Sequence, residues 1–241
     1  MRKITAREFK QSIKRDPAWA LTLTDPVEIT DYCDMDGSKI THLSALLHFS
    51  GRNNIGNAAT FEGCKHLKVA EGKFAGLVDF STSGVEKIGR LEITAPNKEG
   101  GAACFWRCYA LNMAEGTYPG GVWFDESGVR TIGELFVTAP DHDGFAAGFF
   151  GCKSLDIAEG TFAGTVDFEQ SGIKKIGKLA ITVPYEDGIK ACFYGCHVRL
   201  PAEFLGREYE MLEATRRKNL DRIAAGKAAA KALKAAPNIE I

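Results

Sequence analysis

The sequence lacks any run of about 18 apolar residues, so it offers no candidate for a membrane-spanning helix. Its opening stretch, MRKITAREFKQSIKRDPAW, lacks the apolar segment of a secretory signal peptide. A formal net charge of −1 leaves little overall field to attract nucleic acid or a membrane surface. We therefore expect a cytoplasmic chain without a membrane partner.

Residue patterns typical of catalysis are absent as well. No histidine is spaced with a cysteine or serine as a base would be with its nucleophile. Asp79 and Asp167 recur at equivalent positions, but Trp123 stands between them, so no carboxylate pair is maintained. The glycine-rich stretches do not fit a strand–loop–helix phosphate motif. We predict that the chain is not an enzyme and has no catalytic residue, metal site or cofactor.

The chain is instead dominated by a 44-residue repeat. Ala-Glu-Gly begins at Ala70, Ala114 and Ala158, and many other columns keep the same interval. Phenylalanine recurs at Phe61, Phe105, Phe149 and Phe193, and at Phe80, Phe124 and Phe168. Ser-Gly pairs at Ser83, Ser127 and Ser171, and the glycines Gly72, Gly116 and Gly160, are expected to mark turns.

Each unit holds two Leu-x-apolar triplets that read as short strands. A longer interval separates the starts at Leu67 and Leu91, and a shorter one separates Leu91 from Leu111. The first and third residues are expected to face inward and the middle one outward. One such turn of chain buries too little apolar surface to fold alone, so the turns must stack. The triplets are Leu67–Val69, Leu91–Ile93, Leu111–Met113, Leu135–Val137, Leu155–Ile157 and Leu179–Ile181.

The stretches Ala59–Leu67, Ala147–Leu155 and Ala191–Cys196 resemble the A-F-x-G-C-x-x-L signature of BspA-type leucine-rich repeats. Val85–Gly89 and Ile173–Gly177 resemble the V-x-x-I-G step of that family. The resemblance covers roughly residues 20–200. It implies a right-handed leucine-rich-repeat-like β-solenoid with short strands, used for protein binding and often found in adhesins at microbial surfaces.

We expect three segments. Residues 1–19 form an N-terminal helical cap, in which Thr5 and Glu8 make a capping box and Phe9 and Ile13 share a face. Residues 20–201 form the solenoid. Residues 202–241 form a C-terminal helix and a basic tail. The segment 1–18 carries a net charge of +4 and the segment 206–241 a net of +3, so the part between them carries −8.

The seven cysteines are an odd number and suit a reducing compartment better than a disulfide framework. Cys64, Cys108, Cys152 and Cys196 follow the 44-residue interval. Two turns of chain would separate neighbouring members by about 10 Å, beyond the reach of about 7 Å for a disulfide. We predict buried thiols that fill the core.

Columns that vary between units at exposed positions are free to specify a partner. The position after the repeated phenylalanine reads Glu62, Trp106, Phe150 and Tyr194. Phe136 falls at the centre of a predicted solvent-facing strand, in a column that also holds Lys68, Asn112 and Asp156, and Trp123 interrupts a column of aspartates. These aromatic residues either anchor an interface or pack locally. The candidate partner surface is Trp106, Trp123, Phe136, Phe150 and Tyr194.

The sequence thus favours a non-enzymatic scaffold that recognises a protein partner through one exposed face. Two alternatives stay open. One is a bacterial surface or secreted adhesin, exported by a route that the sequence does not reveal. The other is a protein that contacts nucleic acid through its basic termini, above all the C-terminal tail. The sequence does not identify the oligomeric state or the partner.

Overall fold

The computed structural model describes residues 1–183, 190–199 and 204. The chain divides into two units, Met1–Leu200 and Pro201–Ile241. Nearly all described residues belong to the first unit. The C-terminal helix and basic tail predicted for residues 202–241 lie outside the described residues, Phe204 apart.

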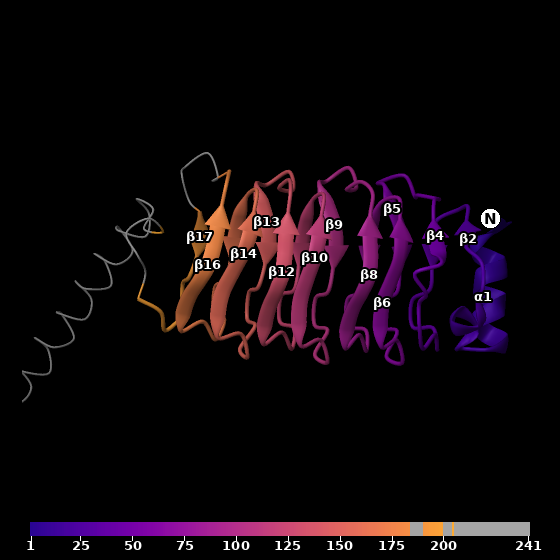
Figure 1. The fold of residues 1–241 in the computed structure, drawn as a ribbon, viewed down its shortest axis with the longest axis horizontal. Helices are drawn as coiled ribbons and strands as arrows, with labels where there is room; N and C mark the ends of the chain where they lie inside the picture. Colours follow the sequence, from indigo (N-terminus) through magenta and orange to yellow (C-terminus); the bar gives the residue numbers. More distant parts are fainter. Residues whose placement is uncertain (184–189, 200–203, 205–241) are drawn as a thin grey trace, which may run out of the picture. The chain divides into compact units, whose positions relative to one another are not determined.

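In Met1–Leu200 the described residues form seventeen β-strands, one α-helix and a short 3-10 helix, and every strand pairing is parallel (Figure 1). The even-numbered strands and β1 make two sheets, ordered β1-β2-β4-β6-β8 and β10-β12-β14-β16. Their bounds are β1 Arg2–Ile4, β2 Val27–Ile29, β4 Leu47–Phe49, β6 Val69–Phe74, β8 Lys87–Ile93, β10 Met113–Tyr118, β12 Thr131–Val137, β14 Ile157–Phe162 and β16 Lys175–Ile181.

The remaining odd-numbered strands make one eight-stranded sheet, in which the strands follow each other in chain order from β3 to β17. Successive strands of the chain therefore alternate between this sheet and the other two. The bounds are β3 Cys33–Asp34, β5 Asn57–Thr60, β7 Leu77–Asp79, β9 Gly101–Cys104, β11 Gly121–Trp123, β13 Phe145–Gly148, β15 Thr165–Asp167 and β17 Ala191–Cys192.

The predicted right-handed leucine-rich-repeat-like β-solenoid is wrong. The described residues form three open parallel sheets of five, four and eight strands with a single α-helix, and no closed solenoid among them. The prediction allowed one short strand per turn of chain and overlooked the eight-stranded sheet. Segments such as Gly101–Cys104 and Phe145–Gly148 are rich in glycine and alanine, which are depleted in strands, so their composition does not reveal them.

The strand register also differs from the predicted one. Lys73 pairs with His48 and Glu92, and Phe136 pairs with Thr117 and Thr161. Lys68, Asn112 and Asp156 were expected in this column but precede their strands. The longer interval between paired residues therefore leads from His48 on β4 to Lys73 on β6, and the shorter one leads from Lys73 to Glu92 on β8. This reverses the predicted order of the two intervals.

The glycines that were expected at turns lie instead where the strand register changes. Gly72, Gly116 and Gly160 lie inside strands β6, β10 and β14 with φ of 113°, 116° and 117°. Each sits where the register with the next strand shifts by one residue. A positive φ suits glycine because no Cβ clashes with the backbone. Met113 and Ile157, which were expected to face inward, are exposed by 43% and 38%.

The core is organised around a continuous stack of phenylalanine rings. Neighbouring centroids lie 5.1–5.4 Å apart, with ring planes within 11–17° of each other and 3° at the Phe105–Phe124 step. The predicted alignment of Phe61, Phe105, Phe149 and Phe193 is confirmed. Rings from the second phenylalanine column stand between them, so the order is Phe61, Phe80, Phe105, Phe124, Phe149, Phe168 and Phe193.

The N-terminal helix α1 (Ala6–Arg15) follows from its sequence. Thr5 caps it, and the reciprocal hydrogen bonds of Thr5 and Glu8 form the expected capping box. Phe9 is fully buried, and its ring packs edge-on against Phe49 and Trp19 at centroid distances of 5.7 and 5.8 Å. Because Phe49 contacts Phe61 in turn, the helix is joined to the end of the stack.

Phe124→Ala tests the contribution of the stack. The substitution removes a fully buried ring with stacked neighbours on both sides. We expect the free energy of unfolding to fall by about 3–5 kcal/mol, measured from the denaturant midpoint. Tyr109→Ala is the control, because Tyr109 is 69% exposed, and should change it by less than about 0.5 kcal/mol. Similar small losses in both variants would contradict a stabilising role for the stack.

Candidate binding surface

One surface of the eight-stranded sheet is built from two columns of residues. The first column is the residue that ends each strand: Asp34, Thr60, Asp79, Cys104, Trp123, Gly148, Asp167 and Cys192. The second lies two positions later in the following turn: Asp36, Glu62, Ser81, Trp106, Asp125, Phe150, Glu169 and Tyr194. We call these two columns together the strip.

The turns of the strip are held as regularly as the strands. The amide of Arg107 donates to the carbonyl of Asp125 at 2.9 Å, and the amide of Glu126 donates to that of Phe150 at 2.7 Å. The same bond recurs from Gly37 to Gln170, turn after turn. The donating residues have positive φ, between 52° and 68°. Four of them are not glycine, so these turns hold a backbone conformation that costs energy and is fixed by the neighbouring turns.

Aspartates at strand ends add to this rigidity. Asp79 and Asp167 each accept the amide of the residue two positions on, at 2.8 and 2.7 Å. Asp125, in the turn column, accepts the amide of Phe150 from the next turn at 2.7 Å. Part of the strip's carboxylate capacity is thus used to fix the turns.

Three aromatic residues of the predicted surface share the turn column. Trp106, Phe150 and Tyr194 lie two strands apart from one another, about 10 Å at a strand spacing of about 4.8 Å. Trp106 and Phe150 are half-buried, and Tyr194 is 58% exposed. Asp125 and Glu169 occupy the same column between them. The structure therefore presents an alternation of aromatic and acidic side chains along one line.

The strip is strongly acidic. Its sixteen positions hold no lysine, arginine or histidine, and seven acidic residues: Asp34, Asp36, Glu62, Asp79, Asp125, Asp167 and Glu169. Four of the five ion pairs in the described part of the chain lie elsewhere, on or beside the strands of the other two sheets, for example Lys73–Glu92 at 2.6 Å. Four acidic residues on or beside the other two sheets are therefore paired with lysines, whereas those of the strip have no basic residue in either column.

Burial, and after it the proximity of like charges, affects the protonation of two aspartates of the strip. Burial, together with the nearby charges of Asp167 and Glu126, raises the pKa of Asp125 to about 6. Burial and the charge of Glu169 likewise raise the pKa of Asp167. A cation placed at the strip would relieve this repulsion.

One cation is already present beside the strip. The Arg107 guanidinium lies over the Trp106 ring, 4.1 Å from its centroid. Its Nε and an Nη donate to both oxygens of Glu126 at 2.8 and 3.3 Å. Arginine is thus bound by one ring and one carboxylate, an arrangement that combines cation–π attraction with a bidentate ion pair.

The other two predicted residues lie outside the turn column: Trp123 ends β11 in the first column of the strip, and Phe136 lies on another sheet. An added Cβ at Gly101 would lie 2.7 Å from both Trp123 and Leu77, so the Trp123 ring packs on the sheet over Gly101 beside Leu77. This is the local packing that the sequence left open. Phe136 is 44% exposed but lies on β12 of the four-stranded sheet. Sequence reasoning missed Arg107, Asp125 and Glu169, whose place becomes visible only with the observed register.

Four of the seven cysteines, Cys33, Cys64, Cys108 and Cys152, are buried in the core, whereas Cys104, Cys192 and Cys196 are partly exposed. The Cys108 and Cys152 thiols donate to the carbonyls of Phe80 and Phe124 at 3.0 Å each and contact the Ser83 and Ser127 hydroxyls. Burial raises the pKa of Cys33 to about 12 and of Cys104, Cys108 and Cys152 to about 11. At neutral pH these side chains are thiols, which are poor nucleophiles.

One group in the described residues has the geometry of a partial metal site, which the sequence did not predict. Ligand atoms of Asp167, Glu169 and Cys192 lie within 4.8 Å of one another. Two carboxylates and one thiol supply three ligands of unlike preference. Burial raises the pKa of Cys192, which disfavours the thiolate that a metal would require. We assign no metal to this group.

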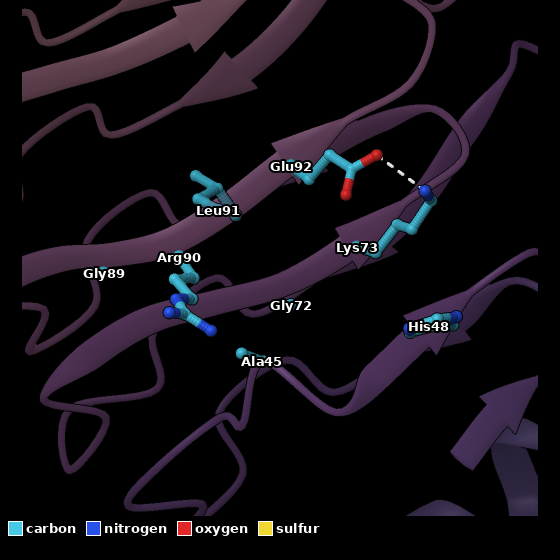
Figure 2. A pocket seen from close by; sticks show the side chains of 8 residues that line it. All are labelled: Ala45, His48, Gly72, Lys73, Gly89, Arg90, Leu91 and Glu92. Carbon is cyan, nitrogen blue, oxygen red and sulfur yellow. Dashed lines mark hydrogen bonds and ion pairs between the residues drawn. The ribbon is translucent and has the colours of Figure 1, made fainter. Parts of the chain in front are cut away.

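A hollow of about 430 Å³ lies on the five-stranded sheet, between β4, β6 and β8 (Figure 2). Gly72 and Gly89 leave it open, and His48, Lys73 and Arg90 line it. Figure 2 shows Lys73 and Glu92 pointing toward each other, whereas Arg90 projects separately. The Glu71 side chain lies beside Gly89, so two carboxylates balance the lysine and the arginine. The hollow therefore has no marked preference for an anion.

Comparison of the chain with protein-family models, with curated proteins and with solved structures gives no match. The resemblance to BspA-type repeats therefore stays a prediction. In the described part of the chain, no helix is long and apolar enough to cross a membrane.

Asp125→Asn tests the electrostatics of the strip. A carboxyl group with a raised folded-state pKa binds protons more tightly in the folded state, so stability falls as pH rises between about 4 and 6. Asparagine keeps the acceptor for the Phe150 amide but has no charge. We expect the variant to be more stable than wild type by about 1–3 kcal/mol at pH 7.5 and equally stable at pH 4. Denaturant unfolding at both pH values measures this.

Asp143→Asn serves as the matched control, because Asp143 is an exposed turn residue outside the strip. It should follow the wild-type pH dependence. If Asp125→Asn also follows it, burial and nearby charge do not disfavour the ionised carboxyl group of Asp125.

Proposed function

We propose that this protein is a non-enzymatic scaffold that binds a protein partner on the strip, and that it acts in the cytoplasm. The observation that carries the proposal is the line of Trp106, Phe150 and Tyr194. Aromatic side chains are favoured anchors at interfaces. Here the backbone hydrogen bonds between successive turns fix the positions of these three residues, so little backbone conformational entropy is lost on binding.

The chemistry of the described residues supports binding rather than catalysis. No histidine in the described part of the chain hydrogen-bonds to a serine or a cysteine, and the only histidine side-chain bond there is that of His42 to Thr41. The buried thiols have raised pKa values. Seven free cysteines also suit a reducing compartment, which supports the cytoplasmic location.

The charge of the strip bears on the class of partner. Seven carboxylates with no basic residue would repel a phosphate backbone. A nucleic acid is therefore not a partner for this face. The proposed contact through the basic tail concerns residues outside the described part of the chain.

A pull-down with three full-length proteins tests this function. Wild type is compared with Phe150→Ala/Tyr194→Ala and with Phe136→Ala/Tyr109→Ala, in which two aromatic residues outside the strip are removed. We expect a partner that is retained by wild type and the second variant and reduced at least about tenfold by the first, since loss of two anchors costs a few kcal/mol. Thermal unfolding checks that all three fold.

A partner retained equally by all three proteins would place the interface elsewhere. Loss with only the Phe136→Ala/Tyr109→Ala variant would assign it to residues outside the strip. Either result would overturn the proposal that the strip is the binding face.

A further inference from the structure

The environment of Arg107 suggests what the strip recognises. Its guanidinium is held between the Trp106 ring and the Glu126 carboxylate. Both partners belong to or border the strip, and the backbone that carries Arg107 has the positive φ of every turn in this column. The molecule therefore contains one example of a bound arginine at a repeated position.

The later repeats keep the ring and lack the cation. Gly151 occupies the position one whole unit after Arg107, next to Phe150, and Gly195 follows Tyr194 in the same way. The φ values of 68° and 76° match the 53° of Arg107. An added Cβ at Gly151 would lie 3.3 Å from Cγ of Glu126. Glu126 already pairs with Arg107, and the position one unit after Glu126 holds the uncharged Gln170.

Carboxylates are also available there. Glu169 lies in the turn column between Phe150 and Tyr194, and the amide of Gly151 donates to its carbonyl at 2.9 Å. Asp125 precedes Phe150 in that column. Among the described residues, no lysine or arginine forms an ion pair with Asp125 or Glu169. The two later repeats thus hold rings with Glu169 between them and no arginine at the position of Arg107. A cation nearby is Lys153, whose ammonium donates to the Gln170 carbonyl and pairs with neither acid.

We infer that the strip binds an arginine-bearing segment of its protein partner. Guanidinium groups of that segment lie about 10 Å apart because the rings are two strand spacings apart. They stack on Phe150 and Tyr194 as Arg107 stacks on Trp106, and they pair with Glu169, since Gln170 replaces the acid of Glu126 there. This inference rests on the proposed function and adds the class of ligand. Arginine is favoured over lysine because its planar group stacks on a ring and pairs with a carboxylate at once.

The spacing gives a direct test. A polyproline helix repeats every three residues with a rise of about 9.3 Å per repeat, close to two strand spacings. Labelled polyproline peptides carrying two arginines at i and i+3 are compared with peptides carrying them at i and i+1, and with lysine at i and i+3. Fluorescence anisotropy at low salt measures binding to the full-length protein. We expect the i,i+3 arginine peptide to bind at least about fivefold more tightly than either control.

Two glycine variants supply the sharpest control. Gly151→Arg adds an internal arginine beside Phe150. Because this arginine competes with the peptide for the Phe150 ring, the affinity of the i,i+3 arginine peptide should fall about fivefold. Gly63→Arg adds the same charge at a turn with φ of 66° but beside Glu62, where the column has no ring. It should change affinity by less than about twofold. Thermal unfolding of both variants separates misfolding from competition.

The Phe150→Ala/Tyr194→Ala variant should bind the i,i+3 arginine peptide no more tightly than it binds the i,i+1 peptide. Equal binding of all peptides, or equal weakening by Gly151→Arg and Gly63→Arg, would overturn the inference and reduce the strip to a nonspecific acidic surface. Failure to bind any peptide, with a pull-down that still depends on Phe150 and Tyr194, would reject arginine recognition but leave the proposed function intact. Loss of strip dependence in the pull-down would reject both.

Discussion

The stack of phenylalanine rings is the interaction on which the rest of the structure depends. Seven rings follow one another at 5.1–5.4 Å, close to the spacing of about 4.8 Å between paired strands. The two spacings agree, so the strands can pair while the rings remain in contact. Every side chain that follows a stacked phenylalanine is consequently held at a defined interval from the next. The regular line of Trp106, Phe150 and Tyr194 is a direct result.

Electrostatics divides the surfaces that this core supports. On the other two sheets, lysines and acids face each other across neighbouring strands and neutralise each other, as in Lys3–Glu28 and Lys73–Glu92. On the strip, acids alternate with aromatic and uncharged residues and have no basic residue in either column. Burial, together with the charges of Asp167 and Glu126, raises the pKa of Asp125 there. Exposed ion pairs contribute little to stability, whereas an unbalanced surface favours association with a partner of opposite charge. The asymmetry therefore concerns binding more than folding.

The sequence revealed the repeat, the alignment of the phenylalanines, the burial of three of the four cysteines in the repeated column and the capping box at Thr5. It did not reveal the fold. Strand-like triplets such as Leu111–Met113 looked complete, but the strand begins at Met113 and continues through Gly116. A glycine is ordinarily evidence for a turn, and only the neighbouring strand shows that Gly116 lies in a bulge. The eight-stranded sheet escaped because alanine and glycine carry little pattern.

The candidate site was foreseen in part for the same reason. Trp106, Phe150 and Tyr194 share the interval of the repeat and could be grouped from the sequence. Asp125 and Glu169 share the 44-residue interval with each other, but they come from the intervening turns of chain, and only the observed register shows that they lie between the rings. Trp123 and Phe136 were included because they are conspicuous, yet one packs on its own sheet and the other lies on a different one. The aromatic side chain of a residue suggested that it contacts a partner, but only the strand register shows which aromatic residues lie side by side.

The alternation of a longer and a shorter step along the chain has a consequence for how such a protein can change. Duplication or deletion of one whole unit keeps every column in register, whereas loss or gain of a single turn of chain would place aromatic positions opposite acidic ones. A copy of the unit that holds Trp106 and Asp125, or of the one that holds Phe150 and Glu169, adds one ring and its neighbouring acid to the line. The valency of the surface can therefore grow or shrink by gene-level copying of a unit, without any substitution in the core.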